Sequence, residues 1–108
     1  MASELLKVSH NIVSNSEVVL INGVSGHTYT ILSITLCETA GAAETFDLFI
    51  DDNGVGTDYE IYSEQAIGAN ETFEHTGKFV IEATDHLVAK CASSAAVHVV
   101  VSYLDQTL

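Results

Sequence analysis

Apolar and polar residues alternate along much of this chain, with the period of two that is typical of a β-strand with one buried face. The pattern is clearest from Lys78 to Leu104, where apolar residues take every second position in three successive runs. Small and polar residues, which turns favour, separate these runs. The runs cover residues 79–81, 87–91 and 97–103. We therefore predict three strands joined by two tight turns in this part of the chain.

The same period predicts further strands at residues 17–21, 28–37, 46–50, 59–62 and 71–74. The longest of them, 28–37, is rich in β-branched and aromatic residues, as strands are. Its expected core face consists of Leu32, Ile34 and Leu36. Its expected second, more polar face consists of Tyr29, Ile31, Ser33 and Thr35. Before this strand, Asn22-Gly23 is a typical hairpin-turn signal, and Gly26 lengthens the loop.

Short strands with turns at short intervals, and no convincing helix, predict an all-β fold. We expect a single antiparallel β-sandwich of about eight strands, jelly-roll-like in its connections. The 108 residues fit one domain with one core. Residues 1–11 are predicted to be an N-terminal arm or an edge strand, and residues 12–108 to be the β-sandwich domain. Proline, which often protects sheet edges, is absent.

Acidic residues far outnumber basic ones. Fifteen Asp and Glu residues face three lysines, arginine is absent, and the formal net charge is −12. Because a phosphate backbone or an anionic membrane is bound through cations, the composition argues against nucleic acid and membrane as partners. The charge keeps an apolar-rich domain soluble; the sharper alternatives are adaptation to salt water or docking on a basic partner. The chain has no run long enough to span a membrane and no secretory-signal pattern, so we expect synthesis in a cytoplasm.

The acidic segment at residues 51–58, DDNGVGTD, combines carboxylates and glycines, as calcium-binding loops do. It lacks the alternating carboxylate spacing and the terminal bidentate Glu of such a loop. We therefore favour a solvated acidic hairpin loop over a calcium site.

No motif indicates catalysis, metal binding or a cofactor. Cys37 and Cys91 have no CxxC or Cys/His neighbour, no serine lies in GxSxG, and we expect both cysteines to be buried, reduced thiols. The histidines show neither HxH nor HExxH spacing; they are His10, His27, His75, His86 and His98. Four tyrosines could form a sugar-stacking platform, or more simply fill a half-buried strand face. They are Tyr29, Tyr59, Tyr62 and Tyr103. We predict no catalytic residue, no metal ligand and no cofactor.

The last strand, residues 97–104, is apolar on both faces apart from His98 and Ser102. A strand of a small sandwich normally shows one face to water. The second face is therefore covered, either by another subunit or by burial of the strand within the domain. In the first case Val97, Val100 and Leu104 belong to an interface, and the protein is a homo-oligomer, with a trimer favoured.

The chain also resembles the small β-sandwich proteins encoded among the virion structural genes of tailed bacteriophages. The similarity spans roughly residues 12–105 and includes the long strand, the small-residue loop at 38–43 and the strand at 45–50. The family often carries a leaGD-l-v signature, which IEATDHLV at residues 81–88 matches. Thr84 replaces the usual glycine, and the proline common before the long strand is missing near Val24.

The resemblance implies a virion component without catalytic residues, assembled in the cytoplasm of a bacterial host. We expect a capsid decoration (cement) protein that binds the major capsid protein or other virion proteins and stabilises the head. Residues 1–11 are a candidate contact element. The alternative is a tail- or fibre-associated module that binds a receptor or carbohydrate. A weaker alternative, a cupin-like metalloenzyme, would need the histidines to converge on a metal.

Overall fold

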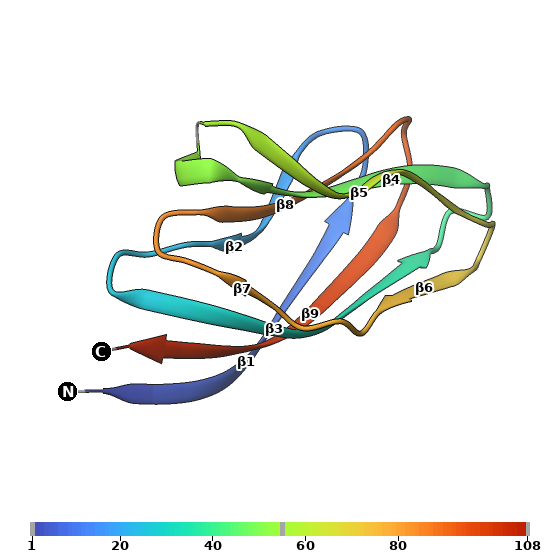
Figure 1. Ribbon diagram of the computed structural model, residues 1–108. Coiled ribbons are helices and arrows are strands. Elements are labelled where there is room, and N and C mark those ends of the chain that lie inside the picture. The colour runs from blue at the N-terminus through green and yellow to red at the C-terminus, as the bar shows by residue number, and fades with distance from the viewer. Residues whose placement is uncertain (1, 55, 108) are drawn as a thin grey trace.

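The computed structural model describes residues 2–54 and 56–107 and consists mainly of β-strands (Figure 1). The strands are β1 (Ser3–Val13), β2 (Val18–Asn22), β3 (His27–Glu38), β4 (Glu44–Asp51), β5 (Asp58–Ile67), β6 (Thr72–His75), β7 (Phe79–Ile81), β8 (His86–Cys91) and β9 (Val97–Thr107). A single 3-10 turn, Asp52–Gly54, follows β4. The predicted all-β fold is confirmed. Among the described residues, no helix has the length and apolarity of a membrane span.

Two antiparallel sheets pack face to face as a sandwich. In the first sheet the order is β1-β9-β3, and β6 and β7 both pair with β3, along separate stretches of it. In the second sheet the order is β2-β8-β4-β5. When β6 and β7 are taken as one position, consecutive strands alternate between the sheets, except for the hairpin of β4 and β5. This is the connectivity of a jelly roll, as the sequence predicted.

The predicted turns join strands of different sheets. Asn22-Gly23 does not form a hairpin, because β2 lies in the second sheet and β3 in the first. Gly23 instead packs on the turn before β8: its N–H donates to the Asp85 carbonyl oxygen at 2.9 Å, and a Cβ there would lie 2.2 Å from that oxygen. The hairpin prediction was wrong, since a local turn signal does not say which strand the next one will pair with. The turns after β7 and β8 also cross between the sheets.

The core fills the space between the sheets with the alternating apolar residues of the strands. The inward positions predicted for β8 and the first part of β9 are buried: Leu87, Ala89, Cys91, Val97, Val99 and Val101. In β3 the prediction was partly wrong, because Tyr29 and Ile31 are buried while Leu32 is half-buried. The pairing with β9 shifts register between Ile31 and Ser33, which marks a β-bulge. An extra residue shifts the alternation along a strand. The inward side chains are therefore at odd-numbered positions before the bulge, such as Ile31, and at even-numbered positions after it, such as Ile34.

A buried carboxylate, that of Glu38, lies at the end of the sandwich opposite the chain termini. Glu38 is 1% exposed, and its oxygens accept four backbone N–H groups. The donors are Ala40 at 2.9 Å, Gly41 at 2.9 Å, Ala42 at 3.2 Å and Asn70 at 3.1 Å. These donors, that of Asn70 foremost, hold the pKa of the Glu38 carboxyl below its ordinary value although burial opposes them. The carboxylate thereby ties the β3–β4 loop to the β5–β6 loop.

A second buried carboxylate, that of Asp105 in β9, lies at the end that carries the termini (left in Figure 1). The ring N–H of His27 donates to its Oδ1 at 2.7 Å, and the Lys7 ammonium donates to its Oδ2 at 2.9 Å. Burial raises the pKa of the Asp105 carboxyl, but the hydrogen bonds from His27 and Lys7 outweigh it and lower the pKa. Because Lys7 belongs to β1, this contact fastens the edge strand to β9.

Candidate functional site

Apolar side chains gather on the outer face of the first sheet, along β1 and β9. In β1, Leu6, Val8 and Ile12 are 78%, 56% and 62% exposed. In β9, Val100 is 40% exposed and Leu104 is half-buried. The strand register places Leu6 directly opposite Leu104. We call these five residues the β1–β9 face.

The β1–β9 face carries neither a carboxylate nor a lysine, although the protein has a net charge of −12. Register and alternation place a set of uncharged or histidine side chains around it: His10, Thr30, Thr35, Cys37, His98 and Ser102. In the described part of the first sheet, the outward carboxylates nearest to this face are Glu4 at the start of β1 and Glu74 on β6. An apolar partner can therefore approach here without burying a charge.

The second sheet presents a different surface. Glu60 in its edge strand β5 lies near other carboxylates, and burial together with Asp47 and Asp58 raises the pKa of the Glu60 carboxyl. Mutual repulsion of this kind disfavours contact with another acidic surface. The two sheets thus differ in what they can bind.

A shallow hollow of about 580 Å³ lies on the β1–β9 face, between the two strands. It is lined by His10, Asn11, Ile12, His98, Val99 and Val100. Its two histidines come from neighbouring strands, and in the described parts of the chain no three His, Cys, Asp or Glu side chains lie close enough together to hold a metal ion. The hollow suits an apolar or aromatic side chain of a partner.

The predicted interface residues lie on two different faces of β9. Val100 and Leu104 belong to the β1–β9 face, whereas Val97 is 0% exposed and points into the core. An interface on the outer face would therefore form without Val97. The strand is central in its sheet, between β1 and β3, yet its outer face is partly open to solvent.

The sequence predicted residues 1–11 to be an arm or an edge strand and a candidate contact element, but the apolar row along this strand was not recognised. Apart from the apolar pair Leu5-Leu6, most residues at positions 1–11 are polar or small. In the structure they form most of an 11-residue edge strand paired with β9. The signal was present, because Leu6, Val8 and Ile12 are spaced by multiples of two, with His10 between.

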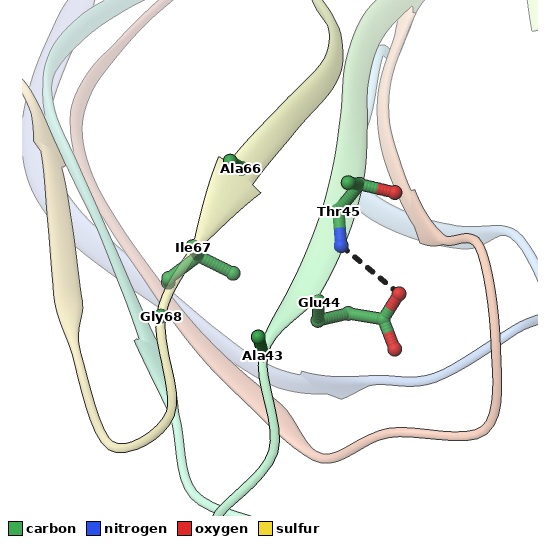
Figure 2. Close-up of a pocket in the computed structure, with 6 residues that line it drawn as sticks. All are labelled: Ala43, Glu44, Thr45, Ala66, Ile67 and Gly68. Carbon is green, nitrogen blue, oxygen red and sulfur yellow. Dashed lines mark hydrogen bonds between the residues drawn. The ribbon is translucent and has the colours of Figure 1, made fainter.

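A second hollow, of about 390 Å³, lies between the start of β4 and the end of β5 (Figure 2). Its lining is Ala43, Glu44, Thr45, Ala66, Ile67 and Gly68. The Glu44 carboxylate accepts the Thr45 N–H at 3.0 Å and the Ser93 hydroxyl at 2.6 Å. Burial raises the pKa of the Glu44 carboxyl, but these hydrogen bonds outweigh it and lower the pKa. A carboxylate that is ionised and hydrogen-bonded on both oxygens is a poor general acid or base.

The acidic segment at residues 51–58 connects β4 to β5, and Asp51 pairs with Asp58 across the hairpin. It is thus a hairpin loop, as predicted, apart from residue 55, which lies outside the described residues. The backbone N–H of Asn53 donates to the Asp85 carboxylate at 3.0 Å. Asp85, from the phage-like signature, therefore links two loops at the same end of the sandwich.

The histidines do not converge. His27 contacts Asp105, and His10 and His98 lie on the β1–β9 face. His75 accepts a hydrogen bond from the Tyr62 hydroxyl at 2.7 Å and donates one to the Gly77 carbonyl at 2.6 Å. Each of these contacts is structural, and none assembles a metal centre.

Cys91 and three of the four tyrosines belong to the core, but the prediction that Cys37 is also buried was wrong, because Cys37 is half-buried on the outer side of β3. Cys37 and Cys91 are free thiols, and burial raises the pKa of the Cys91 thiol to about 11, so it stays protonated. Tyr59 is 59% exposed, whereas the other three tyrosines are buried or packed against the core. They are Tyr29, Tyr62 and Tyr103. The four tyrosines therefore do not form a shared platform.

No family model matches this chain, and no curated protein matches its sequence. Solved structures match its fold. A chain from Bacillus endospore appendages, described as disulfide-linked pili, has a TM-score of 0.57 at 11% identity, with 98% of this chain and 87% of that chain covered. A chain from the acidic stable capsid of Helicobacter pylori bacteriophage KHP30 has a TM-score of 0.56 at 13% identity, with 100% and 94% covered. A chain from the T13 particle of IBDV has a TM-score of 0.54 at 8% identity, and the match covers 97% of this chain but 31% of that one. At such identities the likeness establishes a shared β-sandwich fold.

Proposed function

We propose that this protein is a structural component of a bacteriophage virion, and specifically a capsid decoration (cement) protein that stabilises the head. The observation that carries the proposal is the β1–β9 face, an exposed apolar surface without carboxylates on an otherwise acidic sandwich. Such a patch on a small soluble domain marks an interaction site. The phage-like signature and the fold shared with a chain of the KHP30 capsid support the phage assignment.

In this role the protein acts by burying apolar surface against the major capsid protein or another virion protein. Leu6, Val8 and Ile12 lie in one row and are 78%, 56% and 62% exposed, so burying each of them contributes about 1–2 kcal/mol, less than burial from full exposure would. The acidic remainder repels DNA and keeps particles from adhering to one another. The protein works as a homo-oligomer.

The proposal is tested by counting this chain in purified particles of the phage that encodes it. Quantitative mass spectrometry is expected to find many copies, in fixed proportion to the major capsid protein. Particles assembled without the chain should release their DNA at a lower temperature. Absence of the chain from the particle would overturn the proposal. A few copies at the tail tip, together with glycan binding, would replace it with the tail- or fibre-associated module.

A matched pair of variants links the function to the face. Val8→Lys/Ile12→Lys places two charges on the β1–β9 face, and particles should lose this variant. Val19→Lys/Val24→Lys adds the same charge at valines that are 44% and 50% exposed outside the first sheet, and this control should still bind. Equal occupancy of both variants would show that the face is not the contact.

A further inference from the structure

Edge strand β1 has one side without a pairing partner. It pairs with β9 on one side, and in the described part of the chain no strand pairs with its other side. The strand is 11 residues long, and its register with β9 runs without a shift. A long, regular edge with free N–H and C=O groups is a template for another strand.

The other three sheet edges are interrupted. In β2 the register shifts between Val19 and Ile21, and in β5 it shifts twice and Glu64 has a positive φ of 48°. The fourth edge is divided into β6 and β7, of four and three residues. Bulges and short strands are devices that prevent edge pairing. Edge strand β1 has neither.

We infer that β1 pairs antiparallel with β1 of a second copy of this chain, joining the two first sheets into one continuous sheet about a two-fold axis. This inference rests on the proposed function, in which the protein is a homo-oligomer, and it identifies β1 as the contact between the subunits. A two-fold interface uses the same surface on both subunits, and an antiparallel pair of identical strands meets this condition. A trimer would require β1 to pair with a different edge of the next copy, and those edges are the interrupted ones.

The size of the contact fits a specific interface. Pairing along 11 residues offers on the order of 10 main-chain hydrogen bonds. Typical protein interfaces contain roughly 10 ± 5 direct hydrogen bonds. On the outer face, pairing also brings Leu6, Val8 and Ile12 beside the same residues of the second copy, which extends the β1–β9 face across the junction.

Charge favours this strand as the place where two copies meet. Two molecules of net charge −12 repel each other, and a junction at the acid-free face keeps most carboxylates apart. Within β1 the charged residues are Glu4 and Lys7, one of each sign. Added salt should therefore strengthen the association by screening the repulsion, whereas an interface built from ion pairs would weaken.

The test is sedimentation equilibrium of the full chain at low salt and at about 0.5 M NaCl, where charges are largely screened. We expect a dimer whose affinity rises with salt. Val8→Lys/Ile12→Lys should weaken the dimer at least about 100-fold, because lysines on an edge block pairing. Val19→Lys/Val24→Lys, with the same added charge outside the first sheet, should dimerise like the wild type. Thermal unfolding of both variants verifies that they are folded.

Hydrogen exchange supplies an independent readout. Alternate amides of β1 should become protected as the protein concentration rises above the dissociation constant. A monomer at high salt, a trimer, or equal dissociation of both lysine variants would overturn the pairing. If the protein is a monomer in solution but abundant in virions, the pairing is wrong and the proposed function stands. If it is a dimer in solution but absent from virions, the proposed function is wrong and the pairing stands.

Discussion

Each end of the sandwich contains a buried carboxylate, but the hydrogen-bond donors differ. At one end the donors are backbone N–H groups, and at the other they are side chains. Glu38 accepts four backbone N–H groups from two loops, whereas Asp105 accepts hydrogen bonds from His27 and Lys7. Backbone donors do not titrate, and loops folded around Glu38 present them together. The donors at Asp105 are ionisable, and one of them belongs to the edge strand. The stability of the terminal end therefore depends on ionisable side chains from different strands, Lys7 and His27.

Backbone conformation also indicates that the terminal end is the less stable of the two. In the loops around Glu38, positive φ values of 83° and 57° fall on Gly41 and Asn70, residue types that adopt this region more readily than others. At the terminal end, a positive φ of 71° falls on Thr84, where the resembling phage family usually has glycine. A β-branched residue is rarely found in this region because of its steric cost. The Thr84 hydroxyl donates to the Asn53 side-chain oxygen, which offsets part of that cost. We expect the terminal end to open first.

Removing the Glu38 carboxylate should have the largest effect. Glu38→Ala leaves four backbone N–H groups without their acceptor in two loops at once, and we expect Tm to fall by about 10 °C or more. Thermal unfolding followed by circular dichroism measures this. Glu74→Ala, which removes an exposed carboxylate from β6, is the control and should change Tm little. Equal behaviour of the two variants would mean that the loop end does not depend on its carboxylate.

Asp105→Asn should destabilise the terminal end to a smaller degree. The neutral amide keeps the shape but loses the charge that attracts Lys7 and His27, at a cost of about 2 kcal/mol. Hydrogen exchange should then accelerate in the first half of β1, while the amides of Ala40 and Gly41 keep their protection. Uniform acceleration across both ends would show that they are not independent. Asp58→Asn, at an exposed site, is the control.

Acid should narrow the stability gap between wild type and the neutral variants Glu38→Gln and Asp105→Asn. The folded pKa of each carboxyl lies below its unfolded value, which is about 4. The carboxylates therefore stabilise the fold fully above that value, and this stability is lost as pH falls through the folded pKa. We expect the Tm gap to be smaller at pH 3 than at pH 7. A constant or widening gap would contradict these pKa shifts.

Substitutions at Thr84 should give the smallest change in stability, and we expect Thr84→Gly to be more stable than Thr84→Ala. Glycine adopts a positive φ freely, so the glycine variant should exceed Thr84→Ala in unfolding free energy by about 1 kcal/mol. Both variants lose the hydrogen bond to Asn53, so their difference isolates the backbone. Chemical denaturation measures it. An alanine variant as stable as the glycine variant would show that Thr84 is not strained.

Much of the fold follows from local pattern. The period of two located the strands from β2 to β9, and their number and spacing predicted the jelly roll. The pattern failed at Leu32, where a bulge changed the inward parity, and at Asn22-Gly23, where the chain passes to the other sheet. Both errors concern pairing between segments far apart in sequence, which a short window cannot report.

The candidate site was predicted in part. Val97, Val100 and Leu104 were predicted as interface residues because both faces of one strand are apolar. The structure places Val100 and Leu104 on the outer face of β9 and Val97 in the core, so the prediction combined residues of two opposite faces. Glu38 looked like one acid among fifteen. Its importance comes from four donors in two loops, which only the folded chain brings together.

By itself, the sequence determined that this chain is acidic and folds into β-strands, since charge follows from composition and side-chain alternation is a property of neighbouring residues. The tertiary structure decided which strands stand at the edges and which carboxylates are buried. It also decided that the open apolar face belongs to β1 as much as to β9. These features depend on non-local pairing, where one bulge or one crossover redirects every side chain beyond it.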